Sequence, residues 1–407
     1  MQNKRRNFLK TTSAGALACL LPGGFIEAYN GGASGKKLIL LSLSGGCDTT
    51  NIFIPYNEPN YYNLRPTIAI DKNTVLPLNT QLGLNPKFTN LKRIWDNNHV
   101  ALFPATHSGL SSNTSHFYQD DFFDSGSYTD NASNNGSKGW LARYFDIKYG
   151  QTTELYAYNF ATKRKMFQNM MTPAFEYETP ENLSLVSEET KANLLEMMPT
   201  KDPSRNTQAL KISNSQKKVF NLFDRLSNLN MGYNNEKSKL YNDAENAKKI
   251  LNGISELEIV QLIQRGYDTH EGQNQTLQSD GGQFDDLDET LGSLYDGLVS
   301  NNELDNTLII VHTEFGRTAN ENGSEGTDHG QASAWFVIGG QVIGGQRGVW
   351  PGFSQNTLIE KNGRHYLKQE TDYRDILSQA LTWLGAEEVS DIFPGYTQNL
   401  KNNEIYL

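Results

Sequence analysis

Short apolar runs alternate with amphipathic segments along this chain, and this alternation restricts the fold more than any other feature. Each run has the length and composition of a buried strand. The runs lie at 37–43, 99–104, 257–263, 307–311 and 334–338. A periodicity near 3.6 residues predicts helices at about 206–226, 236–253, 283–300 and 371–385. Strands that alternate with helices predict an α/β fold, a three-layer sandwich with a mainly parallel central sheet.

Polar side chains that could carry chemistry lie in the loops beside these runs. They are Asp48, His107, His116, Asp268, His270, Glu314, Asp328 and His329. Because the carboxyl ends of parallel strands lie along one edge of a sheet, we expect these side chains to converge there. Neutral imidazoles and carboxylates are the ligands of divalent metals such as zinc and manganese. The sequence therefore predicts a metal site at this edge.

Each part of this set also has a purely structural interpretation. Asp48 is a suitable helix N-cap, and the Asp-Thr-His at 268–270 is a common capped turn. Glu314 and Arg317 are spaced for a structural ion pair. For His312, directly beyond a buried strand, we expect a hydrogen-bonded structural role. Their positions on successive strand ends are better explained by a shared site.

Residues 1–30 have the pattern of an export signal. Arg5 and Arg6 precede Asn-Phe-Leu-Lys, as in the twin-arginine motif, and a short apolar run follows at 14–21. That run is too short for a bilayer, which takes about 20 apolar residues, and no later segment is long and apolar enough either. We expect the twin-arginine translocase to export the protein to the periplasm or beyond, with an ordinary secretory signal as the alternative. Plain cleavage is favoured over a lipid anchor on Cys19.

The remaining chain, 31–407, is predicted to be one α/β domain with a polar, helix-rich insert at about 180–255. About 375 residues are enough to bury a large core. The formal charge of −10 becomes more negative without the basic signal, so nucleic acid is excluded as a partner. After cleavage beyond Cys19, Cys47 is the one cysteine left, and an intramolecular disulfide is impossible.

Several sequence words around the candidate loops match a known family. They are 41–51 (LSLSGGCDTTN), 55–68 (PYNEPNYYNLRPTI), Ser115-His116-Phe117, 139–144 (GWLARY), 267–270 (YDTH), 314–318 (EFGRT), 326–330 (GTDHG) and 372–375 (DYRD). With these words the chain resembles the domain of unknown function 1501 (DUF1501) family, whose members are usually exported by the twin-arginine route. The resemblance covers nearly all of residues 36–395.

That family is similar to the alkaline phosphatase and sulfatase superfamily. The resemblance implies an α/β sandwich with two metal ions and a nucleophile, which hydrolyses phosphate or sulfate esters. By the same resemblance Asp48 is a ligand of one metal, and Asp268, His270 and His329 are ligands of the other. Ser115, before an apparent helix at 116–124, matches the nucleophile position.

Two further residues have implied roles in this resemblance. Arg317 could hold a substrate oxyanion in a bidentate fork. His116 is a ligand, a general acid or a residue packed below the site. The nucleophile also has neighbouring alternatives, and Ser115 itself could be a plain N-cap. The alternatives are Ser111, Ser112 and Thr114.

The chain departs from the superfamily pattern at three points. Asp268 and His270 are two positions apart where four is usual. Glu314-Phe315 stands where Asp-His is usual, which makes the second metal site richer in oxygen and favours manganese, magnesium or calcium, or leaves that site empty. Residues 47–51 do not fit the sulfatase signature, so a formylglycine sulfatase is disfavoured.

The sequence therefore favours an exported, metal-dependent hydrolase of phosphate or other anionic esters. The expected cofactors are divalent ions, with zinc, manganese, calcium and magnesium all open, and the expected ligand is a small anionic ester or a glycan. Two alternatives of another class remain. One is a relative that binds metal or a glycan without catalysis, and the other is a structural or adaptor protein of the cell envelope.

Overall fold

The computed structural model describes residues 35–108, 114–127, 138–150, 156–160, 165–168, 170, 174–176, 224–399 and 404–405. The expected export signal, Ser111, Ser112 and the 180–223 part of the expected insert lie outside the described residues. In the part of the chain that is described, no helix combines the length and the apolar character needed to cross a membrane.

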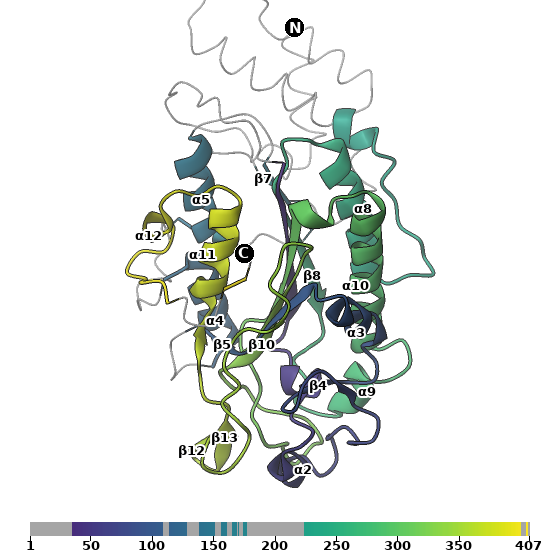
Figure 1. Ribbon diagram of the computed structural model, residues 1–407, viewed down its shortest axis with the longest axis vertical. Coiled ribbons are helices and arrows are strands. Elements are labelled where there is room, and N and C mark those ends of the chain that lie inside the picture. The colour runs from purple at the N-terminus through teal and green to yellow at the C-terminus, as the bar shows by residue number, and fades with distance from the viewer. Residues whose placement is uncertain are drawn as a thin grey trace, which may run out of the picture.

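A nine-stranded central sheet forms the middle of the described molecule (Figure 1). Its long strands are β1 (Lys37–Ser44), β5 (Val100–His107), β8 (Ile259–Arg265), β9 (Thr307–His312) and β10 (Ser333–Ile338). Its short strands are β6 (Ala157–Asn159), β7 (Ala174–Glu176), β11 (Gly345–Gln346) and β14 (Thr371–Asp372). All five strands predicted from apolar runs are confirmed.

The strand order is β11-β5-β10-β9-β1-β8-β6-β7, with β14 paired to β5. The pairings are parallel except for those of β10, which runs antiparallel to both β5 and β9. The mainly parallel sheet is therefore confirmed. Because β10 is reversed, the loop before it lies at the same edge as the loops that follow β1, β8 and β9.

Helices cover both faces of this sheet, as expected for a three-layer sandwich (Figure 1). One face carries α3 (Thr89–Asp96), α8 (Lys239–Gly253) and α10 (Gln283–Ser300). The other carries α4 (His116–Ser125), α5 (Trp140–Tyr149), α11 (Tyr373–Trp383) and α12 (Val389–Ile392). The helices predicted at 236–253, 283–300 and 371–385 are confirmed, whereas most of the one at 206–226 lies outside the described residues.

Each side of the sheet packs against its own hydrophobic core. Along β1, Ile39, Leu41 and Leu43 belong to the core under α8 and α10, and Leu38 and Leu40 belong to the core under α5 and α11. A strand buried on both faces needs apolar side chains at successive positions. This explains why the sequence shows continuous apolar runs instead of strict alternation.

Smaller elements connect the strands and helices of the sandwich. A three-stranded sheet joins β2 (Phe53–Ile54), β4 (Gly83–Leu84) and β3 (Leu76–Pro77), and β12 (Ile359–Lys361) pairs with β13 (Arg364–Tyr366) as a hairpin. The short helical pieces are η1 (Thr49–Asn51), α2 (Pro59–Leu64), η2 (Lys165–Phe167), α9 (Gln273–Leu277) and η4 (Leu304–Asn306). Figure 1 shows α2, α9 and the hairpin together at one end of the molecule.

Candidate metal centre

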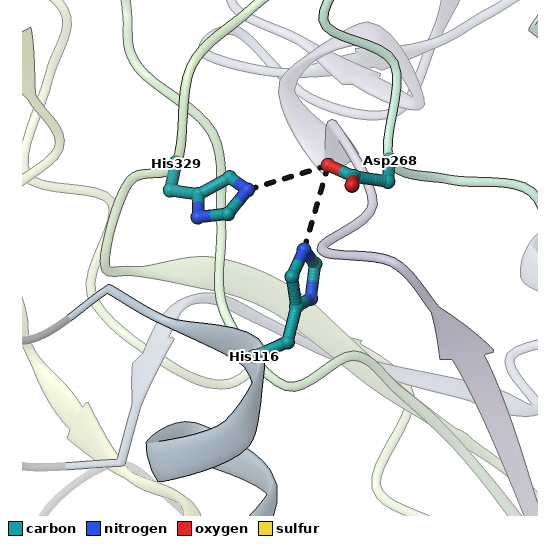
Figure 2. Close-up of side chains that lie close together, drawn as sticks. All are labelled: His116, Asp268 and His329. Carbon is teal, nitrogen blue, oxygen red and sulfur yellow. Dashed lines mark hydrogen bonds and ion pairs between the residues drawn. The ribbon is translucent and has the colours of Figure 1, made fainter.

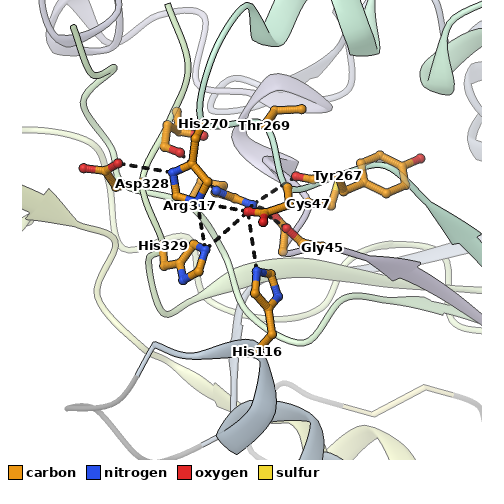
Figure 3. A network of polar contacts seen from close by, with 12 residues as sticks. Gly45, Cys47, His116, Tyr267, Thr269, His270, Arg317, Asp328 and His329 are labelled. Atoms are coloured by element: carbon orange, nitrogen blue, oxygen red, sulfur yellow. Dashed lines mark hydrogen bonds and ion pairs between the residues drawn. The ribbon is translucent and has the colours of Figure 1, made fainter. Parts of the chain in front are cut away.

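Side chains from three separate segments meet at the carboxyl-end edge of the sheet (Figures 2 and 3). Asp268 and His270 follow β8, His329 precedes β10, and His116 is the first residue of α4. A strand end or a helix start holds each of them, so the rigid sheet sets their positions. The convergence expected at this edge is therefore observed for these four residues.

One carboxylate oxygen lies at the centre of the group. The distances to Asp268 Oδ1 are 3.4 Å from His116 Nε2, 3.0 Å from His270 Nε2 and 3.3 Å from His329 Nε2. The two nitrogens His270 Nε2 and His329 Nε2 are 3.0 Å apart. His116, Asp268 and His329 offer ligand atoms that all lie within 4.8 Å of one another, close enough to hold a metal ion (Figure 2).

The other ring nitrogen of each histidine faces an oxygen atom that can only accept. His329 Nδ1 lies 2.6 Å from the Thr114 carbonyl, His116 Nδ1 lies 2.8 Å from Glu314 Oε1, and His270 Nδ1 lies 3.4 Å from Asp328 Oδ1. In a neutral imidazole one nitrogen carries hydrogen, so wherever Nδ1 donates to its oxygen, Nε2 keeps a lone pair. With these tautomers, three lone pairs face a carboxylate oxygen whose one further donor is Arg317.

Charge and burial favour the deprotonated forms of Asp268 and His329, which a cation needs, and the protonated form of His116. Burial opposes ionisation of Asp268, but the hydrogen bond and the charge of Arg317 outweigh it and lower the pKa of Asp268 to about 2. Burial, together with the positive charges of Arg317 and His116, lowers the pKa of His329. The hydrogen bond to Glu314 raises the pKa of His116.

Glu314 and Asp328, both expected as ligands, lie behind the imidazoles. Glu314 is buried and accepts from His116 Nδ1 and from the Gly45 N–H at 2.8 Å. Asp328 lies between His270 Nδ1 and Arg364 Nη2, the latter at 2.7 Å from its Oδ2. In these positions the two carboxylates can fix the tautomer and ring orientation of the histidines.

The geometry of Arg317 does not favour its expected role as a substrate fork. Its side chain is fully enclosed. The guanidinium donates to the carbonyls of Gly45, Gly46 and Tyr267 and, at 3.0 Å, to that of Thr327. It also holds Asp268 Oδ1 at 2.6 Å (Figure 3). Arg317 therefore holds the loops of the site together, and its guanidinium is not exposed to a substrate.

Asp48 does not reach the cluster, so the structure does not support it as a ligand. Its carboxylate is fully buried and forms a two-point ion pair with Arg65, at 2.7 and 3.1 Å. Gln273 Nε2 donates to the same carboxylate at 2.7 Å. Asp48 has the N-cap position before η1, as the structural interpretation expects, but its side chain makes no capping hydrogen bond. The sequence word at 55–68 contained Arg65, but its partner could not be inferred from it.

Phe315 fills the place where the resemblance expects a histidine. The ring is buried, and its centre lies 4.7 Å from the ring centres of both His116 and His329. Gly46, at φ 68°, lies against the same ring, and a Cβ added there would be 2.1 Å from a Phe315 carbon. Phe315 is therefore a packed wall that supports the two imidazoles.

The remaining candidates have clear positions. Ser115 is the N-cap residue of α4, directly before His116, and its side chain makes no capping bond. His312 is buried and stacks on Phe123 with ring centres 4.4 Å apart, which fits the structural role expected of it. His107 ends β5 opposite Asp372 of β14, and burial lowers its pKa.

An open cavity of about 760 Å³ gives access to the cluster. It is lined by Ser44, Gly45, His116, Asp120, Arg265, Gly266, Asp268, Thr269, His270, Glu271, Thr276, Glu314 and Ser324. Among these lining residues Arg265 carries the one permanent positive charge. Arg265 is the last residue of β8, and its position at a strand end was the signal in the sequence that could have identified it.

Comparison with known families places this chain. The model of the family described as "Protein of unknown function (DUF1501)" matches residues 105–374. The chain belongs to the DUF1501 family. The matched stretch contains His116, Asp268, His270 and His329, so the whole cluster lies within the part that defines this DUF1501 protein. A comparison with the curated proteins found no relative of the sequence.

Several solved structures are similar to this DUF1501 protein at low sequence identity. A protein in the alkaline phosphatase superfamily from Vibrio parahaemolyticus is 13% identical, with a TM-score of 0.37 over 97% of this chain and 78% of the other. The PsFucS1 sulfatase from Pseudoalteromonas sp. is 10% identical, with a TM-score of 0.41 over 91% and 73%. Alkaline phosphatase from the Antarctic bacterium TAB5 is 10% identical, with a TM-score of 0.32 over 76% and 92%.

Proposed function

We propose that the protein binds one divalent metal ion through His116, Asp268, His270 and His329 and hydrolyses esters of phosphate or another anionic acid. The observation that supports this proposal is the convergence of three imidazole nitrogens on one carboxylate oxygen, at 3.0 to 3.4 Å. Like-charged or lone-pair atoms held this close are costly unless a cation lies among them.

The donor set fits such an ion and narrows its identity. His116 Nε2 is buried and, among the described residues, has no hydrogen-bond partner, which leaves a polar atom that a cation would satisfy. Three imidazoles with one carboxylate suit zinc or manganese better than calcium or magnesium, which prefer oxygen ligands. Because Asp48 is paired with Arg65 and Phe315 replaces an imidazole, we propose one ion and not two.

A cation in this position supplies Lewis-acid stabilisation of the charge that develops on an ester group. The protein's own residues supply orientation and binding. Glu314 holds the Nδ1 hydrogen of His116 and so directs its Nε2 toward Asp268. Arg265 on the cavity wall offers a guanidinium to a substrate anion.

Ser115 is our proposed nucleophile. It precedes His116 at the start of α4, a helix of 10 residues, where the first backbone N–H groups favour negative charge. Ser111, Ser112 and Thr114 are its alternatives, of which Thr114 gives its carbonyl to His329. His116 is proposed as a ligand, which leaves general acid catalysis to another group.

Export by the twin-arginine translocase to the periplasm or beyond remains part of the proposal. This route carries folded proteins, so an ion could be loaded before export. The mature chain, 31–407, is proposed as one domain with its helical insert, and a lipid anchor at Cys19 remains the less favoured alternative.

The test combines elemental analysis with an ester screen on protein exported by its native route. We expect about one equivalent of metal per chain and turnover of at least one phosphate or sulfate ester. His270→Ala should lose both, whereas His99→Ala, which removes a histidine that contacts Tyr295 at the opposite edge of the sheet, should lose neither. Wild-type protein without metal, or turnover that survives His270→Ala, would overturn the proposal.

The second candidate function is metal or glycan binding without catalysis. The observation that favours it is the enclosure of Arg317, which removes the guanidinium expected to hold a substrate oxyanion. The same screen separates the two, because this candidate predicts bound metal with no turnover of any ester. Absence of both would favour an adaptor of the cell envelope.

A further inference from the structure

A buried side chain links the two loops that carry three of the proposed ligands. Gln273, the first residue of α9, is fully buried. Its Oε1 accepts from the Thr269 hydroxyl at 3.1 Å and from the Thr327 hydroxyl at 2.7 Å. Thr269 lies between Asp268 and His270, and Thr327 lies two residues before His329. A single amide oxygen therefore holds both loops beside their ligands.

The other end of this amide is bound to a rigid ion pair. Gln273 Nε2 donates to Asp48 Oδ2 at 2.7 Å, and Asp48 is paired with the fully buried Arg65. The guanidinium of Arg65 makes five hydrogen bonds, to Asp48 twice, to Asn51 and to the carbonyls of Thr318 and Ala319. With that many fixed partners, the Asp48–Arg65 pair cannot shift without breaking several charge-assisted hydrogen bonds.

The direction of the amide is determined by these partners. A carboxylate only accepts, so the NH₂ group of Gln273 faces Asp48 and its oxygen faces the two threonines. Each threonine hydroxyl must then donate. Reversing the amide would place its oxygen against the Asp48 carboxylate, two acceptors with no hydrogen between them, so this arrangement has one stable orientation.

We propose that Gln273 is a positioning residue that, together with Asp48, sets the spacing between the loop of Asp268 and His270 and the loop of His329. The inference rests on the proposed function, since it concerns the same metal. It assigns to Asp48 a role behind the site in place of the ligand role expected from the resemblance. Backbone hydrogen bonds from Thr327 N to Thr269 O and from Gln273 N to Glu325 O bring the loops together. The Gln273 side chain then fixes both loops to the Asp48–Arg65 pair.

The experiment measures the dissociation constant of Zn²⁺ by competition with a chelator, with apo-protein stability measured in parallel. Gln273→Leu keeps the volume of the side chain but removes all three of its side-chain hydrogen bonds. The double variant Thr269→Val with Thr327→Val removes only the two hydroxyl donors. We expect each to raise the dissociation constant by about tenfold to a hundredfold, as for other groups that orient ligands.

The matched control is Gln379→Leu on α11, a buried glutamine that also uses both ends, donating to Asp375 O and accepting from Ile405 N at 2.9 Å each. Gln379→Leu should lose stability without a change in Zn²⁺ affinity. Gln273→Leu would show the same result if the role of Gln273 were purely structural.

If wild-type protein binds Zn²⁺ and the Gln273 variant binds it equally well, the inference is overturned and the proposed function stands. If Gln273→Leu does not fold, the threonine pair decides by the same criterion. Wild-type protein that binds no Zn²⁺ would overturn both.

Discussion

The Nε2 atoms of His270 and His329 lie 3.0 Å apart, although the residues are separated by 59 positions in the chain. The Nδ1 atom of each ring faces an oxygen behind it, of Asp328 for His270 and of the Thr114 carbonyl for His329. When both Nδ1 atoms donate, the two facing nitrogens present lone pairs in the neutral state. This relationship is the basis of the predictions that concern the metal.

Asp268→Asn should abolish stable metal binding. Asp268 Oδ1 is within 3.4 Å of all three imidazoles, so the amide removes the charge that every ligand shares. We expect the metal content to fall from about one equivalent to near zero after dialysis. Elemental analysis measures it, with Asp280→Asn, an exposed partner of Lys87, as the control that should keep its metal. Unchanged content in Asp268→Asn would contradict the site.

The metal-free protein should show a specific pH dependence of stability. The pKa of Asp268 falls from 3.8 to about 2 in the folded state, because the hydrogen bond and charge of Arg317 outweigh burial. A lowered pKa stabilises the fold above the unfolded value, and this contribution is lost as the pH falls through the folded value. The difference in unfolding free energy between wild type and Asp268→Asn, measured with urea in chelator, should persist from pH 7 to about 4 and shrink toward pH 2. A difference that does not vary with pH would contradict the Arg317–Asp268 pairing.

Glu314→Gln should shift the pH range of metal release. The hydrogen bond to Glu314 raises the pKa of His116, and a protonated His116 cannot bind metal. Removing the charge should lower that pKa, so half-release moves to a lower pH. At pH 8 the affinity should still fall by about tenfold, because His116 loses the carboxylate that orients it. Metal titrations from pH 8 to 5 test both the shift of half-release and the loss of affinity. A half-release pH that moves upward would count against the pairing of Glu314 with His116.

Arg265→Ala should separate substrate binding from metal binding. The guanidinium lies on the cavity wall and outside the ligand group. For an ester found in the screen we expect KM to rise about tenfold, the value of one hydrogen bond to a charged group, with metal content unchanged. Arg93→Ala, which removes a partner of Asp296 on α10, is the control. Equal KM values in wild type and Arg265→Ala would assign anion recognition to another group.

Glu258→Ala should destabilise the fold without affecting the metal. Glu258 is fully buried, and it accepts from Lys148 at 2.8 Å, from Tyr144 at 3.0 Å and from Tyr149. Removing one partner of a buried pair leaves Lys148 without its counter-charge and costs about 3 kcal/mol. Urea unfolding measures this loss, while the zinc dissociation constant should stay within about twofold of wild type. A lowered zinc affinity would indicate that the fold and the site are more tightly coupled than the contacts suggest.

The fold could largely be predicted from the sequence, because periodicity is a local property. Five apolar runs and three helical segments correspond to observed elements, and 283–300 matches α10 at both ends. The reversed direction of β10 was not predicted, since a run at 334–338 looks the same in either direction. Its direction depends on which strands lie beside it.

The sequence alone also determined where the reactive side chains would gather. Asp268, His270 and His329 lie beside strand ends, and strand ends of this kind share an edge. The sequence could not determine which polar groups face the cavity and which are enclosed. Asp48 and Arg317 were expected in the site, but each is buried against partners far away in the chain, Arg65 and Gln273 for Asp48 and the strand-end carbonyls for Arg317. The tertiary structure decided this, because a buried charge takes the nearest opposite charge or dipole that the packed chain brings to it.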